Sequence, residues 1–379
     1  MWLAWLAWLT AHHTSCALAP DLAGRSFGHL HAGSAHKIKF CRHHPTSPIK
    51  QMNTSRRQII QFTGTAALLA GMGRQALAQA IDSTKIIAGF APGGTADIVS
   101  RRIADKLHPG YAKNAVVENK TGAGGQIAVS FVKNAAPDGA TALLTPMSML
   151  GIYPHTYKKL AYDPVNDLTP VSAAALFDYG FAVGPMVPAS VHTVPEFLAW
   201  CRVNPTQANF GSPAAGSSPH FIGALLGKAG QVDLRHVAFR GTQPAVLDLM
   251  GGQIAAVSGP SGDFAPHVAG GKVRVIGTSG PKRGRFTPNI PTLQEQGFKD
   301  MAFTEWFGFF LPAKVSPEAV THLNAAIRAA LATQDVIDGL AALYLEPLPT
   351  SPAQLAAMLK ADTAMWGPLV KAVGFTPEG

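Results

Sequence analysis

Charged residues are scarce in this sequence. Asp, Glu, Lys and Arg make up 14% of its 379 residues, whereas hydrophobic residues make up 47%. So little charge beside so much apolar content excludes an intrinsically disordered chain. The length suffices for two domains of ordinary size, so the sequence predicts folded domains with sizeable cores.

No strongly basic stretch runs through the body of the chain. The formal net charge is +9, but residues 1–80 alone hold eight Lys and Arg and a single Asp. The remainder carries 23 basic and 21 acidic residues. A body so close to neutrality offers no electrostatic footprint for DNA or RNA, so we exclude nucleic acid as a partner.

Cysteine is almost absent. Cys16 and Cys41 lie near the N-terminus, which leaves Cys201 alone in the body and excludes an internal disulfide there. There is no CxxC pair and no Cys/His spacing typical of zinc. The phosphate-binding sequence GxxxxGK[ST] is missing, and TGAGGQI (121–127) places Ile127 where a dinucleotide site needs glycine. We expect neither a metal nor a cofactor.

Catalytic motifs are missing as well. Ser217 or Ser218 beside His220 offers a nucleophile and a base, but no GxSxG turn and no third triad member accompany them. The sequence holds no HExxH motif and no obvious pair of carboxylates for acid–base work. We therefore expect a binding protein with no catalytic residues.

Residues 52–80 have the three parts of an export signal. Arg56 and Arg57 precede an apolar stretch, and small residues end the segment at Ala80. The apolar stretch is shorter than the ~20 residues that a membrane-spanning helix needs. The paired arginines resemble a twin-arginine signal, and an ordinary secretory signal is the alternative. We expect cleavage after Ala80.

Residues 1–51 make little sense as structure. They hold seven of the 14 histidines, without regular ligand spacing. Their apolar run MWLAWLAWL is too short to span a membrane. We expect translation to begin at Met52 and residues 1–51 to be a non-native upstream extension.

From Ile81 onward, short apolar runs alternate with helical patterns, which is typical of α/β folds. Strands are expected at 85–90, 115–119, 140–145, 208–212, 235–239, 254–258 and 272–279. Helices are expected at 97–107, 124–135 and 244–252, and after Ser316 and Ser351 as N-caps. Val99, Ile103 and Leu107 recur every four residues and predict the buried face of the first helix.

Two longer apolar runs, residues 170–184 and 303–312, stand apart from this alternation. We expect each to be a strand that passes between two lobes, so that the second lobe is inserted into the first. The expected division is 81–177 plus 303–379 for lobe 1 and 178–302 for lobe 2, with hinges near 176–184 and 300–306. A ligand would lie in the cleft between the lobes.

The stretch FAPGGTAD (90–97) joins a strand to a helix through a Gly-rich turn. Free backbone N–H groups at the positive end of a helix dipole bind anions without a basic side chain. We expect Thr95 to cap the helix and Asp97 to stabilise its first turn; a plain β–α turn without a ligand is the alternative. Residues 209–226 repeat the pattern, so two facing loops of this kind could clamp a carboxylate.

Taken together, these segments resemble the Bug (TctC-like) family of extracytoplasmic solute receptors, which serve tripartite tricarboxylate transporters. The matching stretches follow one order: FAPGGTAD (90–97), VVENKTGAGG (116–125), APDGAT (136–141), LAYDPVNDLTPVS (160–172), SSPH (217–220), HVAFRGTQPAVLDLMGGQI (236–254), AGGKVRVIGTS (269–279), IPTLQEQGF (290–298) and EWFGFFLPA (305–313). The resemblance implies an α/β Venus flytrap of the type II periplasmic binding-protein class, with two α/β lobes and a ligand cleft between them.

The resemblance also implies a site and partners. The expected ligand is a small carboxylate, and the expected partners are the membrane permease subunits of a tripartite tricarboxylate transporter. A receptor that presents its bound state to a membrane sensor kinase is the alternative. We expect a periplasmic monomer. The expected ligand-binding residues are Phe90, Pro92, Gly93, Gly94, Thr95, Asp97, Ser148, Ser212, Ala215, Gly216, Ser217, Ser218, His220 and Gly259.

Three positions depart from the pattern that this family usually shows, and one of them is Tyr153, which stands where asparagine is common. Ala255 and Gly259 stand where acidic residues are common. Family members that bind amino acids can use acidic groups at the distal end for the ammonium. An uncharged or aromatic distal group on the ligand is therefore favoured over an amino acid, with neutral drift as the alternative.

Overall fold

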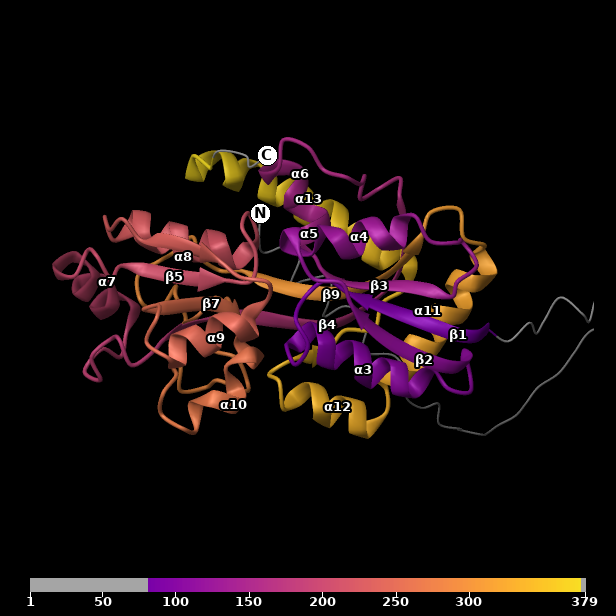
Figure 1. Ribbon diagram of the computed structural model, residues 1–379, viewed down its shortest axis with the longest axis horizontal. Coiled ribbons are helices and arrows are strands. Elements are labelled where there is room, and N and C mark those ends of the chain that lie inside the picture. Colours follow the sequence, from indigo (N-terminus) through magenta and orange to yellow (C-terminus); the bar gives the residue numbers. More distant parts are fainter. Residues whose placement is uncertain (1–80, 376–379) are drawn as a thin grey trace, which may run out of the picture. The chain divides into compact units, whose positions relative to one another are not determined.

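The computed structural model describes residues 81–375, so the expected export signal (52–80) and upstream extension (1–51) lie outside the described residues. Strands and helices alternate through the first two thirds of this part, and the last third is mainly helical (Figure 1). The strands and helices expected from Ile81 onward are found, with bounds shifted by a few residues.

The first sheet has the strand order β2-β1-β3-β9-β4. β1 pairs in parallel with β2 and β3, whereas β9 pairs antiparallel with β3 and β4, and β10 pairs antiparallel with β4. The strands of this sheet are β1 (Ile81–Ala88), β2 (Ala112–Asn119), β3 (Thr141–Pro146), β4 (Leu168–Val183), β9 (Thr304–Pro312) and β10 (Glu346–Pro347).

The second sheet is built on the far end of β4. This end pairs antiparallel with β7 and β8, and β5 pairs in parallel with β7 and β6. The added strands are β5 (Asn209–Ser212), β6 (Arg235–Ala238), β7 (Ala256–Pro260) and β8 (Arg274–Thr278).

β4 belongs to both sheets. Residues 168–178 of β4 pair with β9, and residues 179–183 pair with β7. The strands expected at 170–184 and 303–312 are thus confirmed as β4 and β9, and β4 runs from one sheet into the other (Figure 1).

Helices cover both faces of the first sheet. α3 (Thr95–Leu107) packs against β1, β2 and β3, and α4 (Gln126–Lys133) packs against β1, β3 and β9. Figure 1 shows these two helices on opposite sides of the sheet. Val99, Ile103 and Leu107 are all buried, which confirms the predicted face of α3.

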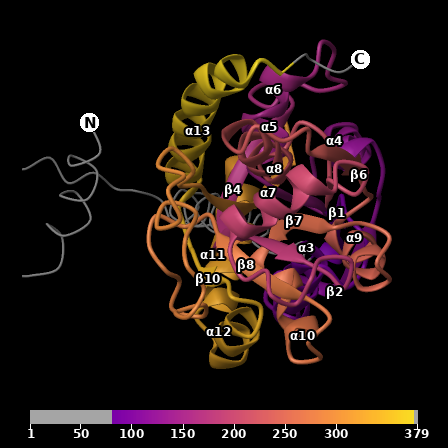
Figure 2. The same cartoon turned by 90° about the vertical axis from the view of Figure 1, so that its left-hand side faces the viewer.

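The C-terminal helices complete this part. α11 (Pro317–Leu331) and α12 (Gln334–Ala341) contact α3, and α13 (Pro352–Val373) contacts β4. α13 also packs against two short helices, α5 (Ser148–Gly151) and α6 (Tyr153–Thr156), and Figure 2 shows it running along one side of them.

The second sheet carries its own helices. α8 (Ser218–Ala229) packs against β5, β6 and β7, and α9 (Thr242–Met250) packs against β5 and β7. α7 (Val194–Val203), a 3₁₀ turn η3 (Ser261–Asp263) and α10 (Ala265–Val268) complete this region.

The helix starts confirm two predictions and correct one. Ser316 accepts a hydrogen bond from the Ala319 N–H, and Ser351 forms a capping box with Gln354, as expected. The prediction that Thr95 caps α3 is wrong, because Gly94 is the N-cap and Thr95 is the first helical residue. Asp97 does not cap the helix but accepts the N–H of Gly93, before the N-cap, at 3.0 Å.

Across residues 81–375, no helix combines the length and the apolarity that a bilayer span requires.

Candidate functional site

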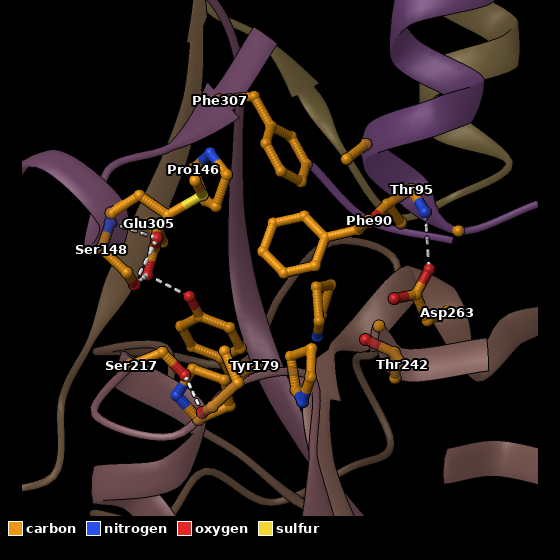
Figure 3. Close-up of a pocket in the computed structure, with 18 of the residues that line it drawn as sticks. Phe90, Thr95, Pro146, Ser148, Tyr179, Ser217, Thr242, Asp263, Glu305 and Phe307 are labelled. Atoms are coloured by element: carbon orange, nitrogen blue, oxygen red, sulfur yellow. Dashed lines mark hydrogen bonds between the residues drawn. The ribbon is translucent and has the colours of Figure 1, made fainter. Parts of the chain in front are cut away.

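A pocket lies where loops from both sheets meet. The starts of α3, α8 and α9 form part of its wall, and the rest comes from the loop after β3, from α6 and η3, and from β4, β7 and β9 (Figure 3). Three helix N-termini therefore converge on one cavity, and each brings backbone N–H groups that lack a partner within their own helix.

The middle of the pocket is apolar. Phe90, Phe177 and Phe307 line it, and the rings of Phe177 and Phe307 stack with their centroids 4.6 Å apart. No lysine, arginine or histidine side chain of residues 81–375 contributes to the wall. Attraction for an anion must therefore come from backbone N–H groups and hydroxyls.

The backbone N–H groups at the start of α3 differ in their hydrogen-bond partners. Gly93 is turned by a φ of +81° and donates its N–H to Asp97. The Thr95 N–H donates to Asp263 Oδ1 at 2.7 Å. For the Ala96 N–H no protein acceptor is found within the described part of the chain, and Ala96 lines the pocket.

Asp97 serves the helix rather than the cavity. Burial alone would raise the pKa of its carboxyl, but hydrogen bonds from Arg101, the Gly93 N–H and Asn119 outweigh burial and hold the pKa below its usual value. Asp97 is thus an ionised group that fixes the Gly-rich turn.

The loop before α8 is braced by its own hydrogen bonds. Ser217 Oγ donates to the Ala214 carbonyl at 2.7 Å, and the Gly216 N–H donates to His220 Nδ1 at 2.9 Å. Burial lowers the pKa of His220 to about 4, so the ring is neutral near pH 7. His220 therefore supports the loop as a hydrogen-bond acceptor and brings no positive charge to the site.

Two carboxylic acids in the pocket wall are not among the ligand-binding residues that were predicted from the sequence. Asp263, at the end of η3, is 4% exposed, and burial raises its pKa to about 6. Glu305, in β9, is fully buried, and burial raises its pKa as well. Both side chains point toward the cavity in Figure 3.

Glu305 organises a cluster of donors around it. Its carboxylate accepts hydrogen bonds from the Ser148 N–H at 2.8 Å, from Ser148 Oγ at 2.7 Å, and from Ser218 Oγ at 2.7 Å. Tyr179 Oη also donates to it. This cluster joins the start of α5, the start of α8, β4 and β9 at one point beside the pocket.

The structure brings together only part of the sequence-predicted set. Five of these residues lie in the pocket wall: Phe90, Gly94, Thr95, Ser148 and Ser217. Ser218 adjoins it through Glu305. The others lie outside the wall: Pro92, Gly93, Asp97, Ser212, Ala215, Gly216, His220 and Gly259.

Several of the outlying residues have a structural role. Ser212 Oγ hydrogen-bonds the Ala214 carbonyl, and the Ala215 carbonyl accepts from Tyr157 Oη. A Cβ at Gly259 would collide with Thr242, so glycine here allows α9 to approach β7 closely. The signal for Glu305 was present in the sequence, as the single acid within the apolar run 305–313; Asp263 had no comparable signal.

The geometry is that of a receptor built around backbone donors, and a comparison with known families agrees. The model of the tripartite tricarboxylate transporter family receptor, TctC, matches residues 99–375. The chain belongs to the TctC family. The expected resemblance is thereby confirmed.

Relatives and solved structures of TctC type are similar along most of this chain. A UPF0065 protein from Cupriavidus necator is 31% identical, over 77% of this chain and 90% of its own. MatC from Rhodopseudomonas palustris, solved with malate bound, is 28% identical with a TM-score of 0.71, covering 76% of this chain and 99% of its own. Another R. palustris protein, solved with adipate, is 26% identical with a TM-score of 0.75, covering 79% and 100%.

The TctC comparisons confirm the predicted fold class, an α/β periplasmic binding protein with two lobes. They also confirm that such proteins are solute receptors and not enzymes. The site agrees, because Ser217 donates to a backbone carbonyl and His220 Nδ1 is taken by the Gly216 N–H. No base is therefore directed at Ser217 through that nitrogen.

Proposed function

We propose that this protein captures a small carboxylate in the pocket and delivers it to the membrane permease subunits of a tripartite tricarboxylate transporter. One observation carries the proposal: the N-termini of α3, α8 and α9 converge on a cavity whose wall has no basic side chain among residues 81–375. Such N-termini stabilise a carboxylate through backbone N–H groups and helix dipoles.

The relatives support the same ligand class. Malate and adipate, which occupy the two R. palustris structures, are both small dicarboxylates. The apolar middle formed by Phe90, Phe177 and Phe307 suits the hydrocarbon part of such a ligand.

Delivery requires that the partner distinguish the loaded receptor from the empty one. We propose that residues 81–177 plus 303–379 and residues 178–302 are two lobes that close on the ligand, with hinges where β4 and β9 cross between them. The bond from Thr95 to Asp263 and the contact between Ser148 and Ser218 would then join the lobes. A ligand that binds the closed form more tightly shifts the population toward it.

The proposal includes a place of action. The protein is exported through the segment 52–80 and cleaved after Ala80. It then acts as a monomer in the periplasm. These parts of the proposal are supported by the signal-like sequence and by the periplasmic solved structures that this chain resembles.

A thermal-shift screen of residues 81–379 tests the ligand class. The panel contains mono-, di- and tricarboxylates, aromatic acids and acidic amino acids, with uncharged sugars as controls. A carboxylate at 100 times its dissociation constant should add about 2.7 kcal/mol of stability. Stabilisation by the sugars, or by no carboxylate, would contradict the proposal. Uptake of the best ligand should stop in cells that lack the permease subunits.

A further inference from the structure

Asp263 connects two parts of the chain that are far apart in sequence. It ends the turn η3 after β7, within residues 178–302, and its Oδ1 accepts the Thr95 N–H at 2.7 Å. Thr95 is the first residue of α3, within residues 81–177. The carboxylate also lies against the Gly-rich turn, since a Cβ on Gly94 would be 3.7 Å from Asp263 Oδ1. Figure 3 shows this bond at one end of the pocket.

The Thr95 N–H is also a donor that a bound carboxylate would use. It is one of the first N–H groups of α3, which have no partner inside the helix. One N–H serves one strong acceptor at a time. Asp263 and a ligand carboxylate at the start of α3 would therefore compete for the same donor.

Charge makes this competition costly. Asp263 Oδ1 accepts the Thr95 N–H, Gln243 Nε2 donates to the Asp263 backbone carbonyl, and the other group that acts on the pKa of the carboxyl, Thr242, is also uncharged. The charged and titratable groups on the neighbouring elements include Asp97 with Arg101 on α3, Asp178 and Tyr179 on β4, His267 on α10 and Glu305 on β9. Arg101 pairs with Asp97, and Asp178 accepts from Ser261. The pocket wall among residues 81–375 has no cationic side chain that could balance a ligand anion beside an ionised Asp263.

We propose that Asp263 sets the pH dependence and the charge preference of the site, because an entering carboxylate takes over the Thr95 N–H and Asp263 takes up one proton from solvent. The new carboxylic acid then donates its O–H to the ligand oxygen. No covalent bond changes, and the proton balances the added negative charge. This inference rests on the proposed function.

The energetic cost of this proton uptake is modest near neutral pH. Because burial raises the pKa of Asp263 to about 6, the acid form lies within reach at pH 7. Above pH 6 the carboxyl is ionised before binding, so affinity must fall as pH rises. Below pH 6 it already holds the proton, so affinity becomes independent of this group.

Calorimetric titration with adipate and with malate tests the inference on the purified protein. The titrations run from pH 6.5 to 8.5, where both ligands stay fully ionised, in buffers of different ionisation enthalpy. The wild type should take up about one proton per ligand and lose affinity by up to about tenfold for each pH unit. Asp263→Asn should bind with no proton uptake, with a flat pH profile, and about tenfold or more tightly at pH 7.5.

Asp362→Asn is the matched control. Asp362 is another acid whose pKa burial raises to about 6, but it bonds Trp306 Nε1 and lies outside the pocket wall. This variant should keep the proton uptake of the wild type. Far-UV circular dichroism verifies that each variant is folded. The number of protons that the wild type takes up on binding tests the inference even if a variant fails to fold.

The outcomes separate the two proposals. Binding of adipate or malate to the wild type without proton uptake overturns the role of Asp263 and leaves the proposed function intact. Proton uptake that persists in Asp263→Asn assigns the proton to another group and overturns it as well. If no carboxylate binds to the wild type or to the variant, the proposed function fails, and the inference fails with it.

Discussion

At the scale of single residues, several polar groups around the pocket already have hydrogen-bond partners within the protein. Gly93 and Thr95 donate their N–H groups to Asp97 and Asp263. Ser217 donates to a carbonyl within its own loop. Small changes in the space around these groups should therefore act on ligand affinity before they act on the fold.

Gly94 offers a direct test of close backbone approach at the start of α3. Its φ of −80° is ordinary for any residue, and a Cβ there would make ordinary contacts of 3.6 Å with the Ala91 carbonyl and 3.7 Å with Asp263 Oδ1. Gly94→Val adds two methyl groups at the pocket wall and should weaken carboxylate binding at least tenfold, measured by calorimetry.

Gly94→Ala is the matched control for that experiment. It loses the same N-cap glycine but adds only the tolerated Cβ, so its affinity should change by less than about threefold. Equal affinities for the valine variant and the wild type would show that the ligand does not approach this backbone.

At the scale of elements, Glu305 ties β9 to the starts of α5 and α8 and to β4. Its carboxylate accepts from donors on Ser148, Ser218 and Tyr179. Glu305→Gln keeps the shape but turns one acceptor into an NH₂ group that faces donors. At pH 8 it should lower the free energy of unfolding by about 1–3 kcal/mol in urea titrations.

Glu318→Gln, in the exposed first turn of α11, is the comparison. It should cost less than about 1 kcal/mol, since it loses only a dipole interaction. Because burial raises the pKa of Glu305, the folded wild type takes up a proton at a higher pH than the unfolded chain. The wild type therefore gains stability as pH falls from 8, so the loss in Glu305→Gln should grow. Equal stability of the glutamine variant and the wild type at pH 8 would contradict an ionised Glu305.

Local patterns were enough to predict the elements, because the periodicity of apolar residues depends only on near neighbours. Val99, Ile103 and Leu107 mark the buried face of α3, and Ser316 and Ser351 mark helix starts. The family resemblance then supplied the fold class. Thr95 was misassigned because α3 starts one residue earlier than expected, with Gly94 as the N-cap, and the Thr95 N–H donates to Asp263, which is remote in sequence.

The site could be predicted only in part, for a physical reason. The Gly-rich turn is local, so Phe90, Gly94 and Thr95 could be placed from sequence. Asp263 meets Thr95 across 168 residues, through the packing of separate elements. No local period encodes such a contact.

At the scale of the whole described part, β4 and β9 are the structural basis for the proposed closure. β4 pairs with β9 in one sheet and with β7 in the other, so a rotation about these strands would move η3 relative to α3. The closed arrangement then depends also on contacts that do not involve the ligand, and one of them is made by Gly262.

Gly262 lies in η3 against Leu343, which follows α12. A Cβ on Gly262 would overlap the Leu343 carbonyl, a backbone group that cannot move aside cheaply. If the lobes open and close as proposed, Gly262→Ala disfavours only the closed form. Carboxylate affinity should fall at least tenfold, while the melting temperature without ligand should change by less than about 3 °C.

Gly270→Ala controls for the loss of a glycine in the same region, because the nearest atom to its Cβ would be the His267 carbonyl oxygen at 3.8 Å. It should leave both affinity and melting temperature unchanged. Small-angle X-ray scattering with saturating ligand should show a smaller radius of gyration for the wild type and little change for Gly262→Ala. A receptor that stayed in one arrangement throughout would behave differently: the overlap would then lower the melting temperature without ligand by well over 3 °C, and the proposed closure would be wrong.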